Sequence, residues 1–270
     1  MIEERRSEPR TTLVAPTNFL YRALRVAADK ADTLIGALGI FLVAGLFVAA
    51  LGVVGFVALA SHVQSGTTQA FDDAVIRWMG AHHTRGLDTI MIELTALGTG
   101  TVVMMIVAVA ALFLVLTSHK YSAILLLAST AGGLVLNNVL KLGFHRPRPA
   151  IFLPEVHTAS SSFPSGHAMS AAIVYSTVAY LAARLIKRRW ARWLVMTAAF
   201  ILIALIAISR LYLGVHYPSD VIAGVVIGLA WAGFCMATLE AIQKFGIRRD
   251  PRILRDEIPA PGAGPASSKR

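Results

Sequence analysis

The sequence predicts an all-α, polytopic membrane protein: a bundle of six transmembrane helices, with short amphipathic helices between the first and second spans. Composition is the first reason, because 56% of the 270 residues are hydrophobic, only 15% are charged, and the mean hydropathy is +0.66. Several apolar runs are also long enough to cross a bilayer. The single cysteine, Cys235, lies inside such a run, which indicates a packing residue and no disulfide framework.

The apolar runs divide the chain into three parts. We expect a basic N-terminal segment at 1–33, a six-span domain at 34–240 and a basic, largely disordered tail at 241–270. No short apolar core with a small-residue cleavage site precedes the first span, so we expect that span to remain attached. The expected spans cover about 34–60, 100–117, 121–140, 165–186, 193–209 and 219–239.

The segment at 61–99 is polar to amphipathic. It predicts two short helices near 68–79 and 87–97, separated by a stretch that contains Gly80 and Gly86. Acidic and histidine side chains occur here, Asp72 and Asp73 among them, but without the His-x3-His or Cys spacing of a metal site. We therefore expect no metal here, and a surface-lying cover over one mouth of the bundle.

The basic residues are distributed as a membrane-topology signal. The formal net charge is +10, and nineteen of the 25 Lys and Arg residues fall on one side of the expected bundle, which contains both termini. This asymmetry predicts cytoplasmic termini in the inner membrane, and it explains the charge without a nucleic-acid partner. The six basic residues on the other side are Arg77, Arg85, Lys141, Arg146, Arg148 and Arg210.

Three polar clusters meet at the outer rim of this topology. The third and fifth spans end outside, and the fourth and sixth spans begin there, so their flanking residues converge. The clusters are Lys141-x6-Arg148-Pro149, Pro164-Ser165-Gly166-His167 and Ser209-Arg210-x5-His216-x3-Asp220. Charged groups at such depth are costly unless they are paired or face an aqueous cavity, which favours a functional site.

All three clusters contain groups that hold an anion. Lys141, Arg148 and Arg210 can neutralise a phosphoryl group, and the two guanidinium groups can do so bidentately. Ser165 and Gly166 begin a helix, whose free N–H groups and positive dipole end bind anions. The residue types therefore predict a phosphate site.

Two histidines supply reactive groups at the same rim. His216 and Asp220 are four residues apart, so on a helical turn the carboxylate can orient the imidazole, and Pro218 suits the first helical position. A neutral His216 can attack phosphorus in line and form a phosphohistidine, while His167 donates a proton to the leaving oxygen and later activates water. This chemistry requires neither a metal ion nor another cofactor.

These motifs resemble the three-part signature of the type 2 phosphatidic acid phosphatase superfamily, with every signature position matched in order. That superfamily includes membrane lipid phosphatases, undecaprenyl-diphosphate phosphatases and vanadium haloperoxidases. The resemblance covers about residues 34–240 and implies a six-helix membrane bundle. The resemblance implies that His167 is the general acid/base, that His216 is the nucleophile and that Asp220 orients it. It implies phosphate binding by Lys141, Arg148, Ser165, Gly166 and Arg210.

The leading functional hypothesis is a metal-independent lipid phosphatase that acts on undecaprenyl diphosphate or on a lipid of the phosphatidate or phosphatidylglycerophosphate type. A lipid phosphotransferase with a lipid diphosphate donor is the alternative among enzymes. A haloperoxidase is less favoured, because those relatives are typically soluble. A transporter or structural membrane protein accounts for the spans, but not for three anion-holding clusters beside two histidines. The sequence predicts neither the particular lipid nor the oligomeric state.

Overall fold

The computed structural model describes residues 43, 45–149 and 161–249. The predicted N-terminal segment at 1–33 and most of the predicted tail lie outside these residues. All regular elements of the described chain are helices, and no strand occurs in it. The all-α prediction is confirmed.

The chain forms a series of long helices with two short ones near the start. The first described helix spans Gly45–Gln64. The helices that follow are α2 (Gln69–Ala81), α3 (Arg85–Ala96), α4 (Gly100–Leu116), α5 (Lys120–Gly143), α6 (Gly166–Leu185), α7 (Arg189–Tyr212) and α8 (Pro218–Arg249). The short helices α2 and α3 match the two amphipathic helices that the sequence predicts.

Five helices are long and apolar enough to cross a membrane, and α3 with α4 forms a sixth candidate bent by 49°. This agrees with the six predicted spans, although several boundaries differ. α7 begins at Arg189, before the expected start near 193, and α8 continues to Arg249, past the expected end near 239. Arginine and alanine are good helix formers, so the helices extend beyond the point where hydropathy falls.

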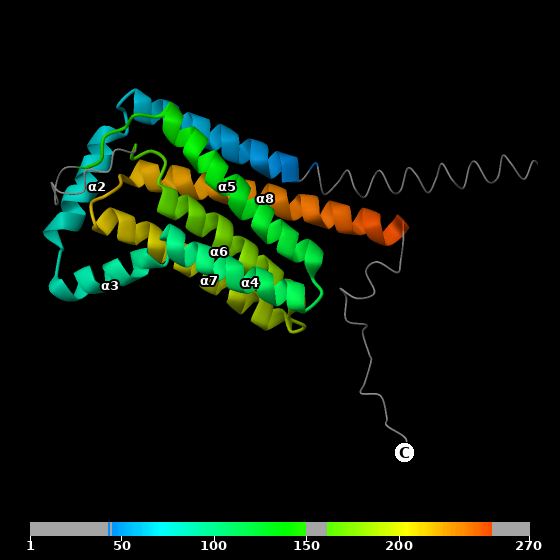
Figure 1. The fold of residues 1–270 in the computed structure, drawn as a ribbon. Coiled ribbons are helices and arrows are strands. Elements are labelled where there is room, and N and C mark those ends of the chain that lie inside the picture. The colour runs from blue at the N-terminus through cyan, green and yellow to red at the C-terminus, as the bar shows by residue number, and fades with distance from the viewer. Residues whose placement is uncertain (1–42, 44, 150–160, 250–270) are drawn as a thin grey trace, which may run out of the picture.

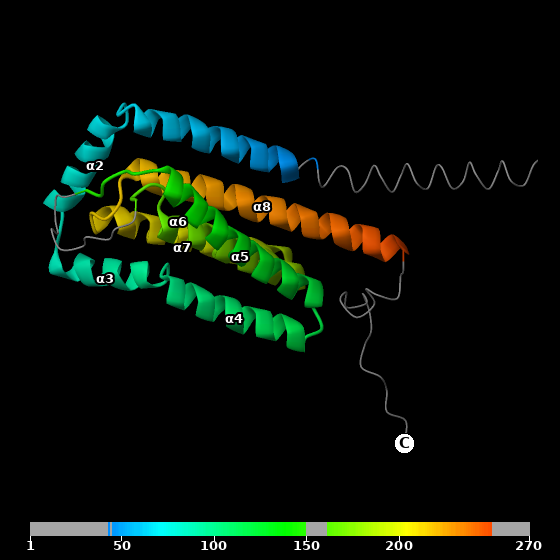
Figure 2. The same ribbon diagram turned by 45° about the horizontal axis from the view of Figure 1, so that its top comes forward.

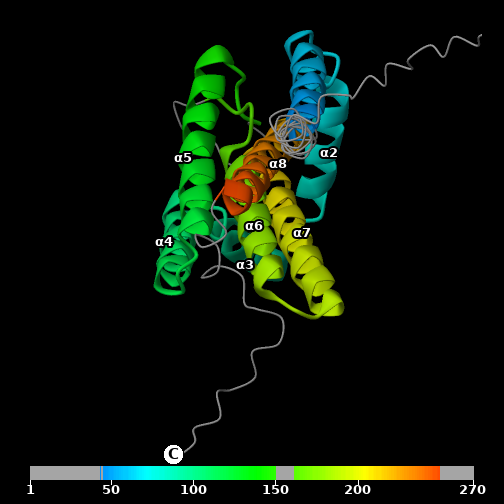
Figure 3. The ribbon, with the colours of Figure 1, turned by 90° about the vertical axis from the view of Figure 1, so that its right-hand side faces the viewer.

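α6 is the central helix of the bundle and packs against α4, α5, α7 and α8, as the three views show (Figures 1, 2 and 3). Its contact with α8 is unusually close. A Cβ atom on Gly224 would lie 2.6 Å from the carbonyl oxygen of Ser165, and one on Gly228 would lie 2.8 Å from that of Met169. Small residues thus allow the two backbones to approach, as is common between membrane helices.

α2 and α3 lie at one end of the bundle (Figure 1), where α2 contacts α7 and α8, and α3 contacts α7. α2 buries Asp72 and Ile76 but exposes Phe71 (62%) and Trp78 (59%). An exposed aromatic face on a short amphipathic helix is typical of the membrane–water interface. The expected cover over one mouth of the bundle agrees with this placement.

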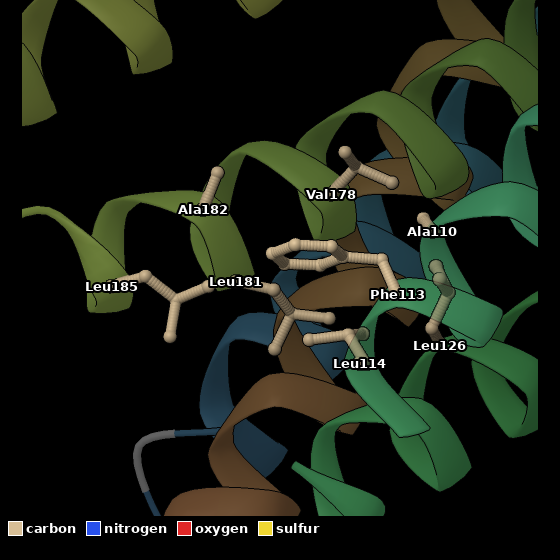
Figure 4. A pocket seen from close by; sticks show the side chains of 8 residues that line it. All are labelled: Ala110, Phe113, Leu114, Leu126, Val178, Leu181, Ala182 and Leu185. Atoms are coloured by element: carbon tan, nitrogen blue, oxygen red, sulfur yellow. The ribbon is translucent and has the colours of Figure 1, made fainter. Parts of the chain in front are cut away.

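An apolar hollow lies among α4, α5 and α6 (Figure 4). It is lined by Ala110, Phe113, Leu114, Leu126, Val178, Leu181, Ala182 and Leu185. The α6 residues of this lining lie roughly 18 to 28 Å along the helix axis from Gly166, at 1.5 Å per residue. The hollow has no group that could hold a phosphate, so it suits hydrocarbon.

Candidate functional site

The predicted site residues gather at the end of the bundle that α2 covers. Lys141 lies in the last turn of α5, and Arg210 lies in the last turn of α7. Ser165 is the N-cap residue of α6, and Asp220 lies in the first turn of α8. His216 lies in the connection between α7 and α8. The convergence expected from counting spans is therefore present in the fold.

A tight turn brings His216 to this end. α7 is followed by Gly214, whose φ of 63° lies in the left-handed region that glycine adopts without strain. Pro218 then begins α8, at the position where its missing N–H has no helical partner. The turn leaves His216 only 2% exposed and four residues before the fully buried Asp220.

Two neighbours fix the orientation of the His216 ring. Nε2 lies 3.3 Å from Nη1 of Arg148, and Nδ1 lies 3.6 Å from Oδ2 of Asp220. A guanidinium can only donate, so Nε2 is the acceptor and Nδ1 carries the proton that faces the carboxylate. Arg148 also donates to the carbonyl oxygen of Val215 at 3.0 Å. The lone pair of Nε2 is thus directed toward the cationic side of the site.

Burial governs the charge of these groups. It lowers the pKa of His216 to about 4, against the opposing effect of Asp220, so the imidazole is neutral at pH 7. Burial also lowers the pKa of Arg148, and Asp220 again opposes the shift. The guanidinium remains charged at neutral pH. A neutral imidazole beside a cation is the state that a nucleophile toward phosphate requires.

His167 and the remaining cations share this environment. The imidazole of His167 lies within electrostatic range of Arg210, His216, Lys141 and Arg148. All three predicted phosphate-binding cations and both predicted catalytic imidazoles thus belong to one electrostatic cluster. Like charges in a buried cluster repel one another, so the cluster favours a bound anion.

Buried polar atoms at this site that make no hydrogen bond within the described residues include Oγ of Ser165, Nε of Arg210 and Nδ1 of His216, the last of which faces Asp220 at 3.6 Å. Such atoms are uncommon in folded proteins and call for a partner, such as a ligand. The backbone N–H of Ser165 donates to the carbonyl oxygen of Asp220 at 3.0 Å, and Nη1 of Arg210 donates to Oγ1 of Thr95 at 2.6 Å. Gly166 follows at the N-terminus of α6, where a Cβ atom would lie 3.3 Å from Oδ1 of Asn137.

Sequence reasoning placed Arg146 among the basic residues of the outer side but missed its role as a third arginine at the site, and its partners. Nη1 of Arg146 donates to Oδ1 of Asp220 at 2.6 Å and to Oγ of Ser219 at 2.7 Å. Nη2 donates to Oδ2 of Asp72 at 2.7 Å and to Oε1 of Gln69 at 3.1 Å. The side chain of Arg146 is 9% exposed, and those of Asp72 and Asp220 are fully buried.

Burial lowers the pKa of Arg146, but Asp220 and Asp72 outweigh it and hold that pKa above its ordinary value. Asp72 therefore forms an ion pair with Arg146. In the described part of the chain, no group of three His, Cys, Asp or Glu side chains could hold a metal ion. The repeated Arg-Pro at 146–149 is the signal that could have drawn attention to Arg146. Asp72 had no comparable local signal.

Comparison with known proteins identifies the family of this chain. The model of the PAP2 superfamily matches residues 122–244. The chain is also 31% identical over 191 residues to phosphatidylglycerophosphatase B of Bacillus subtilis (strain 168), covering 70% of this chain and 94% of that protein. The chain belongs to the PAP2 superfamily. The resemblance that the three motifs carry is confirmed.

Two further PAP2 comparisons agree. Undecaprenyl-diphosphatase BcrC of Bacillus subtilis (strain 168) is 31% identical over 157 residues, which cover 55% of this chain and 73% of that protein. The crystal structure of a transmembrane PAP2 type phosphatidylglycerolphosphate phosphatase from Bacillus subtilis superposes with a TM-score of 0.68 at 29% identity, covering 72% of this chain and 96% of the other. The protein is a multi-pass membrane protein of the PAP2 superfamily.

Proposed function

We propose that this protein is a metal-independent lipid phosphatase, which hydrolyses the phosphate or diphosphate monoester of a membrane lipid through a phosphohistidine on His216. The names of its relatives, a phosphatidylglycerophosphatase and an undecaprenyl-diphosphatase, support lipid phosphates as the substrate class. The single observation that carries the mechanism is the orientation of His216, with Nε2 toward Arg148 and Nδ1 toward Asp220.

In the first step Nε2 of His216 attacks phosphorus, so a P–N bond forms and the P–O bond to the lipid breaks. The lipid oxygen receives a proton from His167 and leaves as a hydroxyl, or as a phosphate when the substrate is a diphosphate. Asp220 stabilises the positive charge that develops on the ring of His216. The negative charge of a bound phosphate stabilises the protonated, imidazolium form of His167 against repulsion by the nearby cations.

In the second step His167, now neutral, takes a proton from water, and the water oxygen attacks the phosphohistidine. The P–N bond breaks, inorganic phosphate leaves, and His216 returns to its neutral form. Negative charge on the equatorial phosphoryl oxygens is stabilised by the N–H groups at the start of α6 and by three cations, Lys141, Arg148 and Arg210.

The charge distribution supports an orientation. Both termini lie in the cytoplasm and the site faces the extracytoplasmic side of the inner membrane, because most basic residues outside the site then fall in the cytoplasm. The exposed Phe71 and Trp78 of α2 lie beside the site end, and exposed aromatic side chains of this kind favour the level of the lipid headgroups. A lipid phosphate can therefore reach the cations while its tails remain in the bilayer.

The test is phosphate release by the purified, detergent-solubilised protein from phosphatidylglycerophosphate, phosphatidate and undecaprenyl diphosphate. We expect turnover of at least one lipid, unchanged by a chelator, and a loss of more than about 10³-fold in His216→Ala. His119→Ala, between α4 and α5 at the other end of the bundle, is the matched control and should retain activity. Turnover by His216→Ala at the control rate would refute the nucleophile. Product analysis with an added acceptor lipid separates hydrolysis from phosphotransfer.

A further inference from the structure

Arg146 connects three parts of the chain: the segment after α5 that carries it, α2, and the start of α8. Its guanidinium binds Gln69 and Asp72 of α2 on one side, and Ser219 and Asp220 at the start of α8 on the other. These contacts join residues separated by 73 to 77 positions in the sequence. A planar guanidinium is suited to such bridging, because it presents five donors in a fixed geometry.

The backbone of Arg146 is anchored as well. Its N–H donates to Oγ of Ser161 at 3.2 Å, and its carbonyl oxygen accepts from the N–H of Ser162 at 3.0 Å. Its guanidinium carbon lies 4.2 Å from the ring centroid of Tyr217, the neighbour of His216. Arg146 is therefore held on both its backbone and its side chain, and little freedom remains for the groups that it binds.

The fixed guanidinium determines where the carboxylate of Asp220 points. Oδ1 accepts from Arg146, and Oδ2 accepts from the backbone N–H of Tyr217 at 2.9 Å while it faces Nδ1 of His216 at 3.6 Å. One oxygen is thus occupied by the arginine, and the other is left for the imidazole. Without Arg146 the carboxylate could rotate, and it would share a buried space with the like-charged Asp72.

Asp72 completes the arrangement from the opposite side. Its Oδ2 binds both Arg146 and the hydroxyl of Ser219 at 2.6 Å, and its Oδ1 accepts from the backbone N–H of Ser219 at 3.1 Å. Ser219 is adjacent to Asp220 at the start of α8, so α2 holds the backbone that carries the orienting carboxylate. The position of His216 therefore depends on a helix outside the spanning bundle.

We propose that Arg146 and Asp72 are positioning residues for His216: α2, through Asp72 and Arg146, fixes the carboxylate of Asp220 and thereby the imidazole that attacks phosphorus. This inference rests on the proposed function. Arg146 directs its donors to the two carboxylates, so it differs in role from Arg148, which lies beside Nε2. Arg146 and Asp72 should therefore affect turnover and leave phosphate binding unchanged.

The experiment compares kcat, KM and thermal stability for Arg146→Met, Asp72→Asn and the double variant. The matched control is Asp73→Asn, the next residue of α2: an asparagine oxygen can still accept from Nε2 of Gln69, so the charge is removed while the contact of Gln69 with Arg146 is kept. We expect kcat to fall about 10²-fold in Arg146→Met and about tenfold in Asp72→Asn, with KM within about twofold, because a misplaced nucleophile slows the chemical step. Asp73→Asn should match the unaltered protein.

The double variant separates positioning from charge balance. Removal of Arg146 alone leaves two buried carboxylates facing each other, which destabilises the fold, and removal of Asp72 as well relieves that repulsion. We expect the double variant to regain thermal stability over Arg146→Met while kcat stays as low as in Arg146→Met. Recovery of kcat together with stability would overturn the positioning role, as would a rise in KM at unchanged kcat.

A readout without turnover keeps this inference distinct from the proposed function. Failure of the unaltered protein and Asp73→Asn to hydrolyse any lipid phosphate would reject the proposed function. NMR of protein labelled with [15N]histidine then still reports the tautomer of His216. The signal of His216 is assigned as the one that is absent from the spectrum of His216→Gln. We expect one tautomer with the proton on Nδ1 in Asp73→Asn, and a mixture in Arg146→Met. An unchanged His216 signal in Arg146→Met would contradict the inference.

Discussion

The close approach of α6 and α8 should control catalysis, and Gly224→Ala tests this. A Cβ atom at position 224 would lie 2.6 Å from the carbonyl oxygen of Ser165, whereas ordinary contacts begin at 3.4 Å. The neighbour is backbone and cannot rotate away, so the two helices must separate by about 0.8 Å locally, which is the difference between these two distances. Gly224 lies four residues after Asp220, on the same face of α8.

This separation moves the N-terminus of α6 away from the start of α8, which carries the orienting carboxylate. It also stretches the 3.0 Å hydrogen bond from the N–H of Ser165 to the carbonyl oxygen of Asp220. A displacement approaching 1 Å in a catalytic site costs up to about 10²-fold in rate, so we expect kcat to fall roughly tenfold to 10²-fold. Overpacking costs about 1 to 3 kcal/mol and alanine regains about 1 kcal/mol of helix propensity, so the variant should fold.

The assay is phosphate release by purified protein, with Gly233→Ala as the matched control. Gly233 is on the same helix, and the nearest atom to its Cβ position is a side-chain carbon of Val48 at 3.4 Å. The control carries the same change in helix propensity without a backbone clash. Equal kcat values in Gly224→Ala and Gly233→Ala would refute the idea that the contact of Ser165 with α8 sets the geometry of the site.

The remaining predictions concern one cation and one imidazole. Thr95→Val removes the acceptor for Nη1 of Arg210 and should raise KM about tenfold, whereas Thr89→Val on the same helix should leave KM unchanged. A normal KM for Thr95→Val would show that α3 does not position this arginine. In a pH profile, kcat/KM should fall as the pH drops through about 4, the pKa of His216, because protonation removes the Nε2 lone pair. Asp220→Asn should move this fall to lower pH, since the carboxylate raises that pKa against burial; a move to higher pH would contradict the assigned pairing.

The gathering of the site could be predicted from the sequence because it depends only on the order and direction of the spans. Lys141 and Arg210 end one pair of helices, and Ser165 and Asp220 begin another, so alternation across a membrane brings them to the same side. The pairing of His216 with Asp220 followed from helical spacing. These features are local or topological, and need no knowledge of side-chain packing.

The contacts of Arg146 could not be predicted in this way. Asp72 lies 74 residues before Arg146, on a short helix. The amphipathic pattern of that helix shows that one face is covered, but it does not show which part of the chain covers it. Because Phe71 and Trp78 face outward while Asp72 is buried beside Ile76, the covered face of α2 is mixed, unlike the apolar covered face of a soluble surface helix. Only the packed structure shows that the buried carboxylate reaches the site.

Trapping the covalent intermediate tests the central claim most directly. Protein incubated briefly with a lipid carrying a [32P]phosphate and quenched in alkali should carry label on the peptide that contains His216. The label should accumulate further in His167→Asn, because the second step then lacks its base. Label on another residue, or the absence of label while phosphate is still released, would contradict the proposed mechanism.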